Sequence, residues 1–174
     1  MRNPEINIYF NRIKMALLLS LSMLVICGIA LLLISPPDYI FTLYEVQTIE
    51  SIFIISFSYG FFVMLIKLIK NKPAITLNEV GLILNNNSFS KKFIKWNEII
   101  NIETEDSFEI KYIVIELINP TEFIEAEKNI FIRKGMKLNY KQYGSPICFS
   151  TTGLKLLHED ILQLLIENFY KYKG

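Results

Sequence analysis

The chain has 174 residues, a formal net charge of +1 and a hydrophobic content of 52%. This balanced charge argues against a nucleic-acid-binding domain, because such domains gather Lys and Arg on one face. Soluble globular chains are about 45–50% apolar, and the excess here lies in the first 70 residues, which indicates a membrane protein.

The first predicted element is a transmembrane helix over residues 15–34. This run, MALLLSLSMLVICGIALLLI, has 20 residues without a charge, and about 20 apolar residues cross the ~30 Å hydrocarbon core as a helix. A cleaved signal peptide is the alternative, but its apolar region is only about 7–15 residues long. The run ends at Ser35-Pro36-Pro37, where proline stops a helix. We therefore expect a permanent anchor.

A second span is predicted over residues 46–66, which contain the uncharged run Ser51–Ile66. The loop at 35–50 contains three acidic residues and no Lys or Arg. The opposite ends of the spans carry the positive charges Arg2, Arg12, Lys14, Lys67, Lys70 and Lys72. Because short loops rich in Lys and Arg stay in the cytoplasm, we expect a multi-pass protein with both termini cytoplasmic.

The spans offer no transport site, because neither apolar run contains an ionisable residue, which a transported ion or proton usually requires. Ala16 with Ser20, and Ser56 with Gly60, have a small-x-x-x-small spacing that permits close helix approach. This spacing would serve either packing of the hairpin on itself or dimerisation.

From Pro73 onward the pattern changes to short β-rich segments. In AITLNEVGLILNN (74–86) we expect two strands joined by a turn at 79–81, with Gly81 supplying a positive φ. Further strands are predicted in FIKWNEI (93–99), IINIETE (99–105) and KYIVIELI (111–118). PTEFIEAEK (120–128) predicts a brief helix that begins with proline, KLNYKQYGSPICFS (137–150) extended structure, and HEDILQLLIENFYKY (158–172) an amphipathic helix.

These elements predict an α+β membrane protein. A transmembrane helical hairpin, residues 1–72, precedes a small β-barrel, residues 73–174, which the C-terminal helix caps.

Two short motifs in the β-rich part carry a resemblance to a known superfamily. ITLNEVGL and IKWNEI, which contains Trp96, the only tryptophan, resemble the first hairpin and the tryptophan-centred strand of pleckstrin-homology-like domains. The resemblance implies that Trp96 packs inside the barrel, so that FIKWNEIINIE is structural and not a reaction centre.

Over nearly its full length the chain also resembles a family of bacterial inner-membrane proteins with two spans and one such domain. The motifs that carry this resemblance, in order, are KPAITLNEVGL, IKWNEI, INP, NYKQYGSPI and a closing helix that ends in YKYK. It implies a cytoplasmic pleckstrin-homology-like domain at the bacterial inner membrane, and it supplies no catalytic residues.

No catalytic, cofactor or metal site is expected. His158, the sole histidine, precedes Glu159 and Asp160, but adjacent residues on a helix point in different directions and a metal site needs three or more converging ligands. Cys27 and Cys148 are expected to be separated by membrane depth, so no disulfide is predicted. The acidic residues Glu103, Glu105, Asp106 and Glu109 are interpreted as a polar turn.

Two groups of basic residues are the candidate contact surface. Lys91, Lys92 and Lys95 flank the tryptophan strand, and Arg133, Lys134 and Lys137, continued by Lys141, precede the YGSP segment. They are interpreted either as an ordinary solvated face or as a contact for anionic lipid headgroups.

The favoured hypothesis is a non-enzymatic module, tethered to the inner face of the membrane, that docks an unknown protein partner or anionic lipid. The alternative is an immunity or envelope-stress protein that protects against a membrane-directed toxin. An enzyme acting on lipid or an envelope precursor is the third hypothesis, and no motif supports it.

Overall fold

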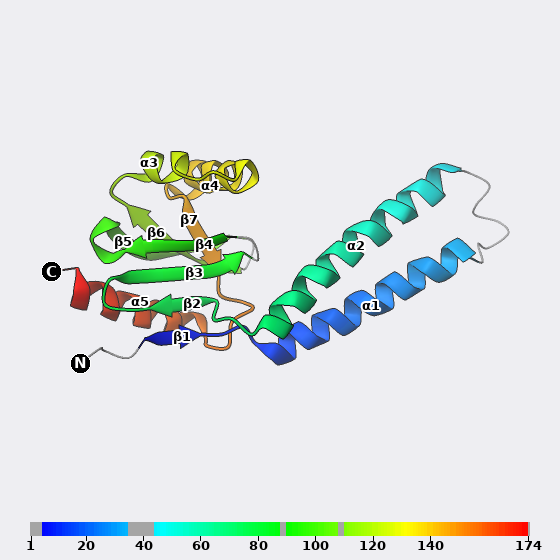
Figure 1. The fold of residues 1–174 in the computed structure, drawn as a ribbon, viewed down its shortest axis with the longest axis horizontal. Coiled ribbons are helices and arrows are strands. Elements are labelled where there is room, and N and C mark those ends of the chain that lie inside the picture. Colours follow the sequence, from blue (N-terminus) through cyan, green and yellow to red (C-terminus); the bar gives the residue numbers. More distant parts are fainter. Residues whose placement is uncertain (1–4, 35–43, 88–89, 108–109, 174) are drawn as a thin grey trace. The chain divides into compact units, whose positions relative to one another are not determined.

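The computed structural model describes residues 5–34, 44–87, 90–107 and 110–173 (Figure 1). Two long apolar helices are followed by two antiparallel sheets and a C-terminal helix, which confirms the α+β class. The chain forms two units, one of Asn11–Lys72 and one of Met1–Phe10 with Pro73–Gly174.

The helical unit contains α1, Arg12–Ile34, and α2, Tyr44–Lys70. Apolar windows of 21 and 23 residues within them are long enough to cross a membrane. The predicted spans, 15–34 and 46–66, lie inside these two helices. Large apolar side chains are exposed along both, including Leu24 at 69% and Ile55 at 68%.

Helices α1 and α2 pack against each other, but not through all of the small residues that the sequence singled out. Ala16, Ser20 and Ser56 are exposed, and the two serine hydroxyls donate to carbonyls of their own helices at 2.8 Å. Gly60 lines an apolar groove of about 290 Å³ between the helices, together with Ser22. The Ala16 and Ser20 pair therefore does not hold the hairpin together.

The first sheet of the second unit has the order β1-β2-β3-β4. Its strands are β1, Ile6–Ile8; β2, Ile75–Leu77; β3, Gly81–Asn87; and β4, Ser90–Lys95. The sequence assigned residues 1–72 to the hairpin, whereas β1 belongs to this sheet. Ile8 pairs with Ile75 and is 1% exposed, and Thr76 Oγ1 donates to Asn7 Oδ1 at 2.7 Å.

The turn between β2 and β3 lies where the sequence predicted it, but Gly81 is needed for a different reason. Asn78 Oδ1 accepts hydrogen bonds from the amides of Val80 and Gly81, both at 3.0 Å. Gly81 does not have a positive φ, so that expectation is wrong. A Cβ at this position would lie 2.1 Å from the carbonyl oxygen of Ile94, and only glycine permits this approach.

The second sheet has the order β5-β6-β7. Its strands are β5, Ile99–Ser107; β6, Ile110–Leu117; and β7, Ile147–Ser150. A single 3₁₀ turn, η1, Trp96–Glu98, leads from β4 into β5. Among the described residues no strand pairing joins the two sheets, so closure into a barrel stays a prediction.

Three helices complete this unit. The brief helix α3, Pro120–Glu125, and the terminal helix α5, His158–Tyr172, confirm their predictions. The prediction of extended structure from residue 137 is wrong up to Tyr143, because helix α4 runs from Ile130 to Tyr143. Asn129 caps its start, with Oδ1 accepting from the amides of Phe131 and Ile132, and Gly144 ends it at a left-handed φ of 73°.

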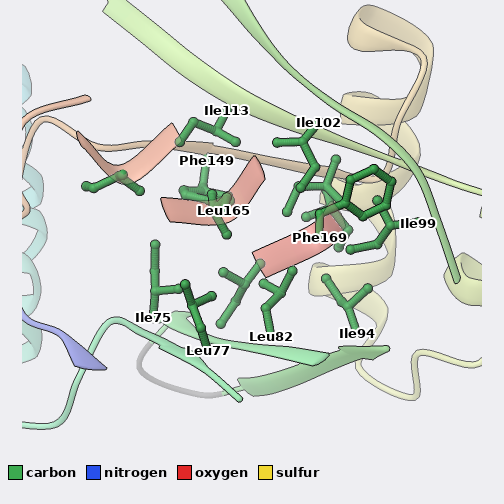
Figure 2. Packing of buried hydrophobic residues seen from close by; sticks show 14 of the residues in the cluster. Ile75, Leu77, Leu82, Ile94, Ile99, Ile102, Ile113, Phe149, Leu165 and Phe169 are labelled. Carbon is green, nitrogen blue, oxygen red and sulfur yellow. The ribbon is translucent and has the colours of Figure 1, made fainter. Parts of the chain in front are cut away.

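One hydrophobic core unites the two sheets and α5. Figure 2 shows Leu165 and Phe169 of α5 between Ile75 and Leu82 of the first sheet and Ile113 of the second. Trp96 is 1% exposed within this core, and its Nε1 donates to the carbonyl of Asn78 at 2.8 Å. The expectation that Trp96 packs in the interior is therefore confirmed.

Candidate functional site

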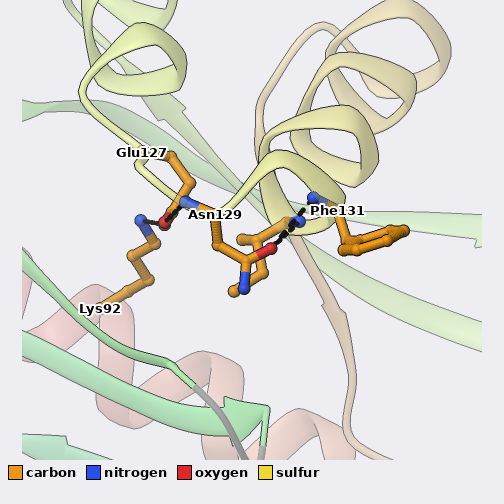
Figure 3. Close-up of polar contacts among 5 residues, drawn as sticks. Lys92, Glu127, Asn129 and Phe131 are labelled. Carbon is orange, nitrogen blue, oxygen red and sulfur yellow. Dashed lines mark hydrogen bonds and ion pairs between the residues drawn. The ribbon is translucent and has the colours of Figure 1, made fainter.

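One lysine of β4, Lys92, lies near a carboxylate that was not among the predicted site residues. The Nζ of Lys92 donates to Oε2 of Glu127 (Figure 3) and lies 5.6 Å from the ring centroid of Phe123. This hydrogen bond, followed by one from the Asn129 amide, lowers the pKa of Glu127 below its ordinary value. Lys92 is therefore held in an ion pair. For Lys91 the backbone lies in β4, and its side chain is outside the described residues.

Lys95 also has an acidic neighbour. It precedes η1, and its Nζ lies 3.9 Å from Oε1 of Glu98, with both side chains about half exposed. The Lys95 amide donates to the other carboxylate oxygen of Glu98 at 3.3 Å. Solvent-exposed ion pairs of this kind are weak, worth about 0–1 kcal/mol. Lys95 therefore keeps access to solvent, although Glu98 balances its charge locally.

The basic residues of α4 are in a different position. Lys134 and Lys137 are exposed, and Arg133 is half-buried. In the described part of the chain none of these three forms an ion pair. The helix contains no acidic residue, so its positive charge is not balanced along its own length.

The Lys92 and Glu127 pair connects the two predicted basic groups. Glu127 lies in the connection from α3 to α4, and its Oε1 accepts from the amide of Asn129, the N-cap of α4, at 2.8 Å (Figure 3). The structure thus joins β4 to the start of α4 through a carboxylate. It does not gather all six predicted residues as free positive charge, since Lys92 and Lys95 are paired.

A surface cleft of about 340 Å³ lies between η1, the end of β6 and α3. Lys95, Glu98 and Glu122 contribute charged groups to it, and Ile118 and Phe123 contribute apolar surface. No local pattern predicts this cleft, because its walls come from segments about twenty residues apart that meet only in the folded chain.

The sole histidine has a structural role. His158 is the first residue of α5. Its Nε2 lies 3.0 Å from Thr104 Oγ1, and its Nδ1 lies 3.0 Å from Thr151 Oγ1. These contacts tie α5 to β5 and to the end of β7, in agreement with the prediction of a histidine at the start of a helix.

Metal ligands and thiols were the remaining candidates for chemistry among the described residues. Among the described residues no group of three or more His, Cys, Asp or Glu side chains is placed to hold a metal ion. Burial, and then the nearby Glu105, raise the pKa of Cys148 to about 11, so its thiol is protonated at neutral pH and is a poor nucleophile. Cys27 and Cys148 are both free thiols.

The predicted polar turn is wrong for its first three acidic residues, which lie in strand β5. Glu109 lies outside the described residues. Burial is the main cause of a raised pKa at Glu103, and repulsion from Glu116 and Glu105 adds to it. Burial and the two neighbouring carboxylates therefore destabilise the ionised form of Glu103.

Comparison with protein-family models, with curated proteins and with solved structures found no match.

Proposed function

We propose that this protein is a non-enzymatic binding module anchored in a membrane by α1 and α2. The observation that carries the proposal is the exposure of large apolar side chains on both helices, such as Leu17 at 64% and Ile52 at 62%. A soluble protein rarely exposes contiguous apolar surface of this extent, and each helix has the length that a hydrocarbon core requires.

The chain connectivity supports a close tether between the membrane and the second unit. Only residues 9–11 separate β1 from α1, and only residues 71–74 separate α2 from β2. Strands β1 and β2 pair, and the Ala74 amide donates to the Ile8 carbonyl at 2.7 Å. Both connections therefore leave the second unit from the same pair of strands.

The location at the inner face of a bacterial inner membrane rests on charge and on the family resemblance. Arg12 and Lys14 precede the first apolar run, and Lys70 and Lys72 follow the second, which favours cytoplasmic termini. The buried Trp96 and the terminal helix α5, together with the two antiparallel sheets, are consistent with a pleckstrin-homology-like domain, although the closed barrel belongs to this proposal.

Binding is favoured over catalysis by the kinds of surface that the second unit offers. It has an open cleft with charges of both signs and a helix, α4, with only basic charges. We propose that such surfaces dock a protein partner or anionic lipid headgroups.

Capture from membranes tests this proposal. The full-length protein would be extracted in mild detergent, and its bound proteins and lipids compared with those of a chain containing only residues 11–72. A partner or anionic lipid retained by the full-length protein alone is expected. Release of the protein from membranes by alkaline carbonate would refute the anchor, and identical bound material on both chains would refute a docking role for the second unit.

A further inference from the structure

Helix α4 combines basic charge with exposed apolar side chains. Over Ile130–Tyr143 it contains one arginine and three lysines, and no acidic residue. It also carries three of the large exposed apolar side chains of this unit, Ile130 at 69%, Phe131 at 87% and Leu138 at 59%.

These side chains gather on one side of the helix. At about 3.6 residues per turn, six residues fall within an arc of about 120°. They are Ile130, Phe131, Lys134, Lys137, Leu138 and Lys141, all exposed. Met136, which is 5% exposed, is buried in the core, and Tyr143 stacks on Tyr112 of β6 with ring centroids 5.9 Å apart. The exposed arc is thus distinct from the side that attaches α4 to its unit.

Folding of the chain does not explain this arc. Phe131 belongs to the first turn, where its backbone amide donates to Asn129 Oδ1 at 3.0 Å (Figure 3). Its ring points away from the Lys92 and Glu127 pair, and the side chain is 87% exposed to solvent. Exposed Phe, Ile and Leu together with Lys and Arg, on a helix without acidic residues, match the composition of helices that lie in a membrane interface.

We propose that the exposed arc of α4 docks into the surface of an anionic lipid bilayer. Phe131, Ile130 and Leu138 enter the boundary between headgroups and acyl chains, while Lys134, Lys137 and Lys141 extend to lipid phosphates. The proposal rests on the proposed membrane anchor and names the partner of that anchored unit.

The charge pattern favours lipid over a protein partner. An anionic leaflet attracts basic residues whatever their spacing. The six residues of the arc follow one another as Ile130, Phe131, Lys134, Lys137, Leu138 and Lys141, so the lysines do not form a polar rim around an apolar centre, as a protein interface would require. The tether adds to this preference, because the short connections to α1 and α2 keep the helix at a high effective concentration near lipid.

Fluorescence quenching in the full-length protein tests the docking. Phe131→Trp would be reconstituted into vesicles of brominated phosphatidylcholine, with or without phosphatidylglycerol, and its emission compared with that of the parent protein. The only native tryptophan, Trp96, is 1% exposed and provides a constant background. We expect loss of the added emission in anionic vesicles, and recovery at 1 M salt, where the Debye length falls to about 3 Å.

Two matched variants locate the effect on α4. Tyr170→Trp places the same probe on α5, where Tyr170 is 76% exposed, and its emission should not be quenched. The triple variant Lys134→Gln/Lys137→Gln/Lys141→Gln, combined with Phe131→Trp, should lose the quenching, since each lysine near an anionic surface changes partitioning about fivefold. Unchanged Trp96 emission in that variant without the probe verifies that the unit is folded.

The outcomes test the docking of α4 and the membrane anchor separately. Equal quenching at Phe131→Trp and Tyr170→Trp, equal quenching in neutral and anionic vesicles, or no quenching at either position would overturn docking by α4. Flotation of the protein with neutral vesicles reports the anchor separately. A protein that fails to float with them refutes the anchor, while quenching by added anionic vesicles still reads out α4.

Discussion

Replacement of Trp96 probes the point where the β2–β3 turn, η1 and the core meet. The indole is 1% exposed, and its Nε1 donates to the Asn78 carbonyl at 2.8 Å. Removing a large buried aromatic side chain costs about 3–5 kcal/mol, so Trp96→Ala should lower the free energy of unfolding by that amount. Trp96→Phe keeps most of the apolar contact and loses the hydrogen bond, which costs about 1 kcal/mol.

The measurement needs a soluble form that retains β1, because Ile8 is buried and pairs with Ile75. Replacing residues 11–72 by a short glycine–serine linker keeps β1 and β2 in one chain. Urea titration followed by circular dichroism then gives the free energy of unfolding. As the control, Phe131→Ala removes an aromatic ring that is 87% exposed and should change stability by less than about 0.5 kcal/mol. Equal stability of Trp96→Ala and the parent chain would refute the burial of Trp96.

Three further predictions concern the same soluble chain. Gly81→Ala should destabilise it strongly, because the new Cβ would lie 2.1 Å from the Ile94 carbonyl oxygen; an unchanged urea midpoint would contradict the close approach. Glu103→Gln should raise the melting temperature at pH 7. Burial and neighbouring carboxylates raise the pKa of Glu103 in the folded state, so its favourable contribution to stability exists only at acidic pH and is lost as pH rises through the folded-state pKa. The gain in melting temperature from Glu103→Gln should therefore vanish below about pH 4. A gain that persists there would have another cause. Glu127 has a lowered pKa, so its contribution to stability is present at neutral pH and is lost as pH falls. A double-mutant cycle of Lys92→Met and Glu127→Gln should give a coupling free energy of about 1 kcal/mol at pH 7 that disappears in acid. Zero coupling at pH 7 would show that the pair is not formed.

The elements that the sequence predicted well are those with strong local signals. The two long apolar runs and the apolar stripe of α5 depend on composition and on period, and the structure has helices in all three places. The turn before Gly81 was also located from local chemistry. The reason for the glycine was not, because the carbonyl of Ile94 approaches it from another strand.

Strand β1 and helix α4 show why the other elements were missed. The strand has only three residues, and its pairing partner β2 lies 69 residues further along the chain, so no local pattern distinguishes it from a polar flank of the first span. In α4, Gly135 and several β-branched or aromatic residues hide the helical period. Its best local signals were the Asn129 cap and Gly144, both of which fit a turn equally well.

The candidate site was only partly predictable for the same reason. The sequence identified Lys92 as basic, but its partner Glu127 lies 35 residues away and meets it only in the fold. The exposed state of Phe131 and Leu138 depends on which side of α4 faces the core. This orientation is fixed by tertiary packing around Met136, which the local sequence does not reveal.

The location of the two termini tests most directly the claim that α1 and α2 anchor a unit at the inner face of a bacterial inner membrane. Each terminus would be fused in turn to green fluorescent protein, which fluoresces in the cytoplasm, and to alkaline phosphatase, which is active only outside it. We predict fluorescence and no phosphatase activity from both ends, because Arg12, Lys14, Lys70 and Lys72 flank the apolar runs on that side. Phosphatase activity at either end would contradict the claim.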